Sequence, residues 1–424
     1  MASSTRTPFD SKHPGRQEGV RVSLRGFAMH TSYHPHPVLL GLLLTLVIAE
    51  AAASDTNFGG PDAVDNQISA DKGDQQKPLR EQWSAKGIEL GLDYSAVGLY
   101  ADTVLPGSDK EAISGMVRLY GSWRPQGQQE NGGGSLVWKL EHRHSYTDTS
   151  VKNFEFGAGG LGLVTPPFND EKGRLTNLYW KQTLSDGEGT LIAGFMDVTD
   201  YVDVYAAASP WTGFMNFAFS TGTNTIALPG DATFGAALGH MLTDSLFVIA
   251  GISDMEADPT RPLESVDNFF NDNHYFRSIE LGWTSSQEQI YLNNIHLTLW
   301  QSDKSDFLNQ ASDKGFNLSA SMMKGNWLPF VRYGNAQDGS LLGIKESLSL
   351  GFVYYGMLAP KNHFGFAINW ADAGSDQYTA EAFYYMKLGK NLELTPDIQL
   401  IVDPALNPGQ DQIWIAGIRA RIFW

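Results

Sequence analysis

Apolar and polar residues alternate with a period of two in short segments from Gly87 to the end of the chain. In residues 88–95, isoleucine, leucine and tyrosine alternate with glutamate, glycine, aspartate and serine, and residues 414–424 alternate in a similar way. Such alternation predicts β-strands with one apolar face. It does not by itself distinguish a soluble sandwich from a membrane barrel, because both contain strands of this kind.

The lengths of the connections between the predicted strands separate these two folds. Connections after even-numbered strands are mostly short, whereas several after odd-numbered strands are long, namely 147–175, 197–230 and 254–274. Short turns at one rim and long loops at the other are typical of outer-membrane barrels, and an even strand number places both termini on the short-turn side. We therefore predict an all-β fold, a transmembrane antiparallel β-barrel of about 16 strands, centred near residues 92, 119, 140, 180, 194, 236, 249, 279, 297, 319, 331, 351, 367, 382, 397 and 418.

The first 53 residues predict a secretory signal peptide. The apolar run from Val38 to Ile48 has 11 residues, too few to span a bilayer as a helix, and the alanines after it offer A-x-A cleavage sites. Met29 is an alternative start that would give a signal of ordinary length, and a buried core helix is the competing interpretation. No other segment is long and apolar enough for a membrane helix, which argues against a helical membrane protein.

The rest of the chain divides into two predicted parts. Residues 54–86 are polar and rich in glycine, aspartate and glutamine, and they predict a periplasmic leader with a short helix after Pro78. Residues 87–424 are the predicted outer-membrane barrel. Export without a membrane helix leaves the periplasm, the exterior or the outer membrane as the location.

Composition argues against several classes of function. The chain has no cysteine, which excludes disulfides and thiolate chemistry, and its net charge of −17 argues against nucleic acid as a partner. The glycine-rich stretch 157–162 lacks the Lys-Ser/Thr of a P-loop, His142 and His144 lack a nearby third metal ligand, and the aspartates of 197–203 lack EF-hand spacing. We expect no cofactor, no metal and no catalytic residue, although a hydrolase with two carboxylates has no motif by which to exclude it.

Four stretches resemble the carbohydrate-selective porin (OprB-type) family. They are FGGPDAVDNQ at 58–67, GIELGLDYSA at 87–96, MNFAFSTGTNTIALPGD at 215–231, and LELTPDIQLIVDPALNP at 392–408 together with the closing IRARIFW. They span nearly the whole mature chain, and the last pair is the most specific. The resemblance implies a sixteen-stranded porin of the bacterial outer membrane that passes monosaccharides such as glucose into the periplasm by facilitated diffusion.

The resemblance also implies partners. Trp424, the terminal aromatic residue after an alternating strand, resembles the signal by which a C-terminal strand is recognised by the barrel-assembly machinery. Outer-membrane lipid would surround the barrel, and both a monomer and a homotrimer remain open. The competing functions are a general or differently selective porin on the same barrel, and an outer-membrane enzyme or secreted β-protein.

Charged residues opposite the apolar strand faces are expected to point into the lumen. The densest cluster has Arg118 on one predicted strand and Lys139, Glu141 and Arg143 on the next. Arginine and carboxylate side chains form strong, oriented hydrogen bonds, so this cluster predicts a constriction that binds sugar hydroxyls. The simpler interpretation is that these charges only hydrate and brace the wall. The other lumenal candidates are Glu89, Asp93, Lys181, Glu280, His296, Arg332, Glu381, Asp397, Arg419 and Arg421.

The longest predicted connection, Asp197 to Gly230, follows the fifth strand. Loops of this length without regular structure are usually functional. We expect it to fold inward and narrow the pore, with Asp203 and Trp211 facing the basic wall.

Overall fold

The computed structural model describes residues 58–72, 82–125 and 133–424. The predicted signal peptide, 1–53, lies outside these ranges and stays a prediction. The helix predicted after Pro78 lies mostly outside them as well, and its last part appears as a short helical turn at 82–84.

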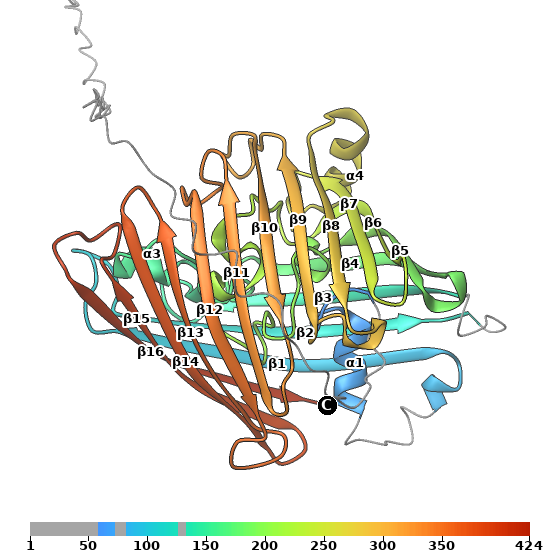
Figure 1. The fold of residues 1–424 in the computed structure, drawn as a ribbon, viewed down its shortest axis with the longest axis horizontal. Helices are drawn as coiled ribbons and strands as arrows, with labels where there is room; N and C mark the ends of the chain where they lie inside the picture. Colours follow the sequence, from blue (N-terminus) through green and yellow to red (C-terminus); the bar gives the residue numbers. More distant parts are fainter. Residues whose placement is uncertain (1–57, 73–81, 126–132) are drawn as a thin grey trace, which may run out of the picture. The chain divides into compact units, whose positions relative to one another are not determined.

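Sixteen strands in the described residues form one closed barrel (Figure 1). Each strand pairs antiparallel with its neighbours in sequence, and β1 pairs with β16 to close the ring. The predicted fold class, strand number and strand positions are therefore confirmed. The strands are β1 (Ile88–Ala101), β2 (Glu111–Trp123), β3 (Gly134–Ser145), β4 (Lys172–Leu184), β5 (Gly189–Met196), β6 (Thr233–Met241), β7 (Leu246–Asp254), β8 (Tyr275–Thr284), β9 (Asn294–Ser302), β10 (Asp313–Ser321), β11 (Trp327–Ala336), β12 (Glu346–Tyr355), β13 (His363–Asp372), β14 (Asp376–Leu388), β15 (Leu392–Val402) and β16 (Gln412–Phe423).

The strands carry apolar residues on their outer face and charged residues on their inner face, as a membrane barrel requires. On β16, Trp414, Ile418 and Ile422 are exposed on the outside, whereas Arg419 and Arg421 are buried inside. A soluble sandwich has the reverse arrangement, with apolar residues inside and charges in water. An apolar exterior around a polar interior therefore identifies the wall as lipid-facing.

The connections follow the predicted asymmetry. The segments 146–171, 197–232 and 255–274 follow odd-numbered strands, whereas β14 and β15 are joined by residues 389–391 alone. The start of β1 and the end of β16 therefore both lie at the short-turn rim.

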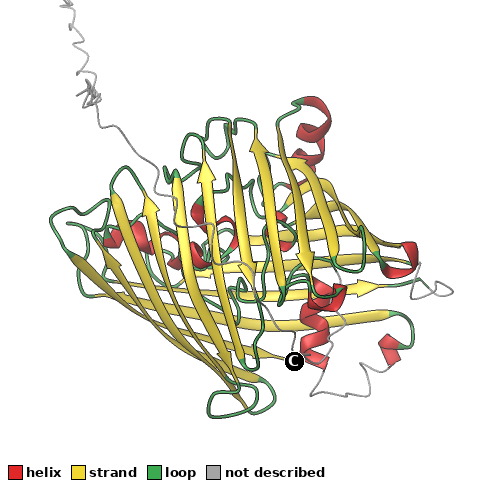
Figure 2. Ribbon diagram, in the orientation of Figure 1, coloured by secondary structure: helices red, strands yellow, loops and turns green. Residues whose placement is uncertain are grey.

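Short helices occupy the ends and the interior of the ring (Figure 2). None of the helices in the described residues is long and apolar enough to cross a membrane. They are α1 (Val64–Lys72) before the barrel, η1 (Val151–Asn153) and α3 (Phe154–Ala158) after β3, η2 (Ser185–Gly187) after β4, η3 (Val198–Asp200), η4 (Phe217–Phe219) and η5 (Thr221–Asn224) after β5, α4 (Pro262–Asn271) after β7, and η6 (Gln287–Gln289) after β8.

Candidate functional site

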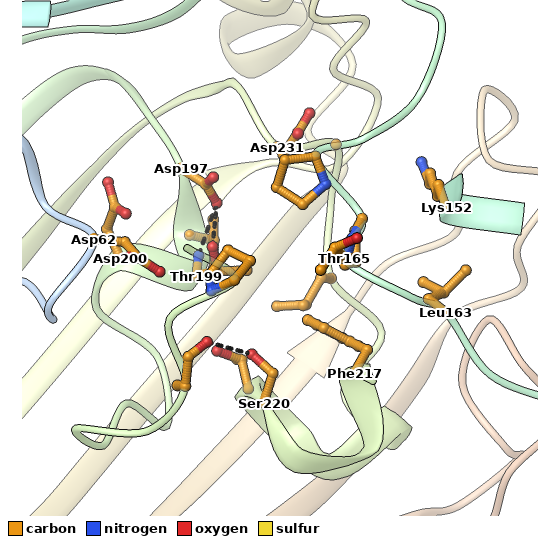
Figure 3. A pocket seen from close by; sticks show the side chains of 18 of the residues that line it. Asp62, Lys152, Leu163, Thr165, Asp197, Thr199, Asp200, Phe217, Ser220 and Asp231 are labelled. Carbon is orange, nitrogen blue, oxygen red and sulfur yellow. Dashed lines mark hydrogen bonds between the residues drawn. The ribbon is translucent and has the colours of Figure 1, made fainter. Parts of the chain in front are cut away.

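The interior of the barrel contains a cavity of about 190 Å³ between the wall and the long loops (Figure 3). The wall contributes Lys139, Glu141 and Arg143 of β3. The rest of the lining comes from the β3–β4 and β5–β6 connections, from the loops at the long-loop rim and from the N-terminal segment at residues 60–62. The predicted residues Lys139, Glu141, Arg143 and Trp211 thus line one cavity.

A β-bulge shapes the wall beside β3. Lys139 pairs with Asn177 and Leu140 with Leu175, so β4 has one extra residue, Thr176, at this point. A bulge changes the direction of neighbouring side chains, and here both Thr176 and Asn177 are buried. The Thr176 hydroxyl donates a 2.7 Å hydrogen bond to Glu141 Oε2.

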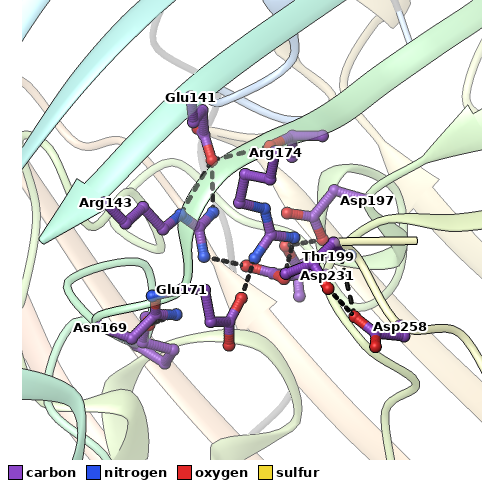
Figure 4. A network of polar contacts seen from close by, with 12 residues as sticks. Glu141, Arg143, Asn169, Glu171, Arg174, Asp197, Thr199, Asp231 and Asp258 are labelled. Carbon is purple, nitrogen blue, oxygen red and sulfur yellow. Dashed lines mark hydrogen bonds and ion pairs between the residues drawn. The ribbon is translucent and has the colours of Figure 1, made fainter. Parts of the chain in front are cut away.

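Two arginines and three carboxylates form a network beside the cavity (Figure 4). Arg143 Nε donates to Glu141 Oε2 at 2.9 Å, and its terminal nitrogen donates to Asp231. Arg174 donates to the other oxygen of Asp231 and also to Glu171. Asp231 therefore bridges two strands of the wall, since Arg143 lies on β3 and Arg174 on β4.

The charges of this network nearly cancel. Lys152 lies 3.9 Å from Glu171 and adds a third cation. Burial would raise the pKa of Asp231, but Arg143 and Arg174 outweigh it and hold the pKa well below its usual range. The result is three cations against three carboxylates, namely Arg143, Arg174 and Lys152 against Glu141, Glu171 and Asp231.

Two aspartates, Asp200 of η3 and its N-cap Asp197, also line the cavity. Asp197 accepts hydrogen bonds from Thr199 N at 3.0 Å and from its hydroxyl at 2.7 Å. Burial, together with the charge of Asp200, raises the pKa of Asp197 to about 7. Burial likewise raises the pKa of Asp200 to about 6, although Lys139 opposes the shift. The pKa values of these two carboxyls are therefore raised, whereas that of Asp231 is lowered.

Arg118 does not line the cavity, contrary to the expectation. Its guanidinium is fully buried, donates to Asp93 at 2.9 Å, and lies over the Trp211 ring at 3.6 Å from the ring centre. A cation stacked on indole and paired with a carboxylate is stabilised on both sides. Arg118 therefore fixes Trp211 in place, and Trp211 itself contacts the cavity.

Asp203 was expected to face the basic wall of β2 and β3, and the structure places it elsewhere. It is buried between β11 and β9, where Arg332 donates to its backbone oxygen at 2.7 Å and His296 Nε2 lies 2.8 Å from its Oδ1. Glu280 accepts a hydrogen bond from the Asp203 backbone N–H at 3.0 Å. Asp203 is an anchor of the β5–β6 loop rather than a lining residue.

The same loop is also hydrogen-bonded to strands β14 and β16. Arg419 donates to the carbonyl oxygens of Pro210 and Gly213 at 2.8 and 3.0 Å, and Glu381 accepts from the backbone N–H of Met215 at 2.6 Å. These bonds come from β16 and β14, whereas Asp203 is held from β8, β9 and β11. The loop lies inside the barrel and is held by these contacts from several sides.

Some of these residues were not apparent from the sequence. Arg174 was assigned to the loop after the third strand, because the alternation there is interrupted by the bulge. Asp231 and Asp62 lie outside the strands and have no periodic signal. The sequence shows that Asp231 and Asp62 are charged, but it does not predict which residues they contact.

Comparison with known proteins now assigns the family. The model of the carbohydrate-selective porin, OprB family, matches residues 140–296 and 297–422, more than half of the chain. The chain belongs to this family. No individually curated protein matches it.

Solved structures agree with the fold of this porin. The high-pH structure of Pseudomonas putida OprB superposes with a TM-score of 0.65 at 15% identity, covering 82% of this chain and 96% of that one. The low-pH structure of the same protein gives a TM-score of 0.51 at 14% identity, covering 82% and 95%. At such identities these likenesses show the fold alone. The family makes the protein a channel rather than an enzyme, which removes the competing enzyme interpretation.

Proposed function

We propose that this porin carries monosaccharides such as glucose across the bacterial outer membrane into the periplasm by facilitated diffusion. The observation that carries the proposal is the charge-balanced network of arginines and carboxylates beside the cavity. Its groups present both donors and acceptors to a passing hydroxyl.

The remaining lining suits the other faces of a sugar. Trp211 and Phe217 contribute aromatic surface, and Pro166, Pro210 and Pro229 add rigid apolar surface. A sugar ring carries C–H groups on its faces and hydroxyls around its edge, so a lining of both kinds matches it. The near-cancelled charge gives an ion little net attraction, because opposite charges a few ångströms apart largely offset each other in water.

Transport by diffusion needs weak binding. A solute that binds too tightly leaves slowly and blocks the flux. The arginines here are already paired with carboxylates, so a sugar exchanges hydrogen bonds rather than satisfying unpaired buried charges. This arrangement favours modest affinity.

A liposome-swelling assay tests the proposal. Vesicles that contain the purified porin should swell faster in glucose than in a short polyethylene glycol of the same size, and slowly in a disaccharide. Equal rates for glucose and the glycol would identify a general porin instead. Absence of swelling would contradict a diffusion channel of either kind.

We also propose that the mature protein resides in the outer membrane after removal of the signal peptide near Ser54. Its apolar exterior supports this location, because unpaired strand edges are costly in lipid and the sixteen described strands close into a ring that has no open edge. The protein should fractionate with the outer membrane and migrate faster on gels before boiling than after. Recovery in the soluble periplasm would refute the location.

A further inference from the structure

The segment before the first strand packs inside the barrel at the short-turn rim. Val64 and Ile68 of α1 are 0% and 3% exposed and join a cluster with Tyr120 and Tyr179, which point inward from β2 and β4. Phe58 fits against Gly239 of β6, where an added Cβ would lie 2.6 Å from its ring. The leader is therefore part of the barrel interior rather than a free tail.

Polar contacts fix the position of this segment. The Gly59 backbone N–H donates to the Tyr291 hydroxyl at 2.6 Å, and Lys181 Nζ lies 2.6 Å from Asp65 Oδ2. Gly60 has φ of +28°, and a Cβ there would lie 2.7 Å from a Val204 methyl and 3.0 Å from Asp200 O. Glycine lets the chain approach the β5–β6 loop this closely.

This placement brings Asp62 to the cavity. Gly60, Pro61 and Asp62 line it, and the Ser209 hydroxyl donates to Asp62 Oδ1 at 2.7 Å. Figure 3 shows Asp62 grouped with Asp197 and Asp200 at one side of the cavity. The carboxylates come from two distant parts of the chain, the leader and the loop after β5.

We propose that the leader is part of the channel wall and that Asp62 is a specificity-determining residue at the periplasmic end of the solute pathway. The pathway then has two stages. A solute first passes the balanced network around Asp231 and next an exit lined by Asp62, Asp197 and Asp200. The positive charge of Lys139 on β3 acts on Asp200 at this exit. The second stage accepts hydrogen bonds from sugar hydroxyls and disfavours anions. This inference rests on the proposed function, because it concerns the same pathway.

The absence of cysteine makes the test direct, because one introduced thiol is the only one in the chain. Asp62→Asn and Asp62→Cys are each compared with the same changes at Asp411, an exposed aspartate of the β15–β16 connection that does not line the cavity. All variants are first checked for the faster gel migration of the unboiled barrel. Currents are then recorded in planar bilayers at about pH 8, because burial raises the pKa of the Asp62 carboxyl and an alkaline solution favours its charged form.

Two results are expected. Asp62→Asn should lower the cation-over-anion permeability ratio about sevenfold, since one charge at a narrow aqueous passage changes the energies of a cation and an anion by about RT each, in opposite directions. A negatively charged methanethiosulfonate should reduce the current of Asp62→Cys and weaken its block by glucose, because the added group narrows the exit. The Asp411 variants should behave as the wild type.

The inference fails if both Asp62 variants keep wild-type selectivity and the thiol reagent leaves the Asp62→Cys current unchanged. That outcome would place the leader beside the pathway rather than along it. Failure of the proposed function is seen separately, as a wild-type current that glucose does not reduce. In that case the ion selectivity of the Asp62 variants still decides the position of the leader.

Discussion

The sharpest prediction concerns the two partners Arg143 and Asp231. Arg143 is 1% exposed and donates to both Glu141 and Asp231, and Asp231 is shared with Arg174. If the network works by balancing charge, Arg143→Gln and Asp231→Asn must shift ion selectivity in opposite directions. Arg143→Gln leaves one negative charge in excess, and Asp231→Asn leaves one positive charge in excess.

The size of the shift follows from Coulomb's law. One charge about 5 Å from a passing ion changes that ion's energy by about 0.8 kcal/mol at the dielectric constant of water, which is a factor of about four in its permeability. The lower dielectric constant near a protein wall would increase this effect. Each variant should also weaken glucose block by about tenfold or less, as expected from the loss of about 1 kcal/mol of hydrogen bonding.

Reversal potentials in a salt gradient measure the selectivity of each variant. The double variant should return close to the wild-type selectivity, because its two changes cancel in charge, while its glucose block stays weak. Shifts of the same sign in both single variants, or none, would refute charge balance as the basis of the constriction.

Three further predictions follow from other parts of the structure. Burial raises the pKa of Asp197 to about 7 and that of Asp200 to about 6. Both carboxyls therefore lose protons and become negative between about pH 5 and pH 8, so the preference of the channel for cations should rise over that range. A selectivity that does not change with pH would contradict this assignment. Arg332→Met removes one of the buried partners of Asp203 and leaves His296. The loss of one partner of a buried pair costs about 3–5 kcal/mol, so thermal unfolding should occur at lower temperature and the open-channel current should become noisier. A quiet, wild-type current would show that the loop needs no such anchor. Trp424→Ser should lower the amount of folded barrel in the membrane. It should leave single-channel conductance unchanged, because the indole is 49% exposed on the outer face and does not line the lumen. Normal membrane levels of the variant would contradict a role of Trp424 in assembly.

The barrel was predictable because lipid imposes a simple rule on every strand. Outward residues facing lipid are mostly apolar, so strand positions appear directly as alternation, and the antiparallel closure of β1 on β16 follows from an even strand count. The same rule identified the inward charges of β3. Nothing in that rule specifies which charge pairs with which, because the partners lie on different strands and loops.

The leader and the loop show what the alternation cannot reveal. Among the side chains of helix α1 that the structure describes, the buried apolar ones are Val64 and Ile68, four residues apart, and Gln67 is buried beside them. That spacing was the one available sign of a packed helix. Arg118 is buried under Trp211, and this contact depends on the path of a loop that follows three strands later. Loop conformation is determined by tertiary contacts such as these, which leave no local pattern.

Glucose-dependent current noise in single wild-type channels tests the central claim most directly. The account predicts brief, reversible interruptions by glucose with a dissociation constant on the order of millimolar, and none by a polyethylene glycol of the same size. Equal interruption by both solutes, or by neither, would contradict a constriction that recognises sugars.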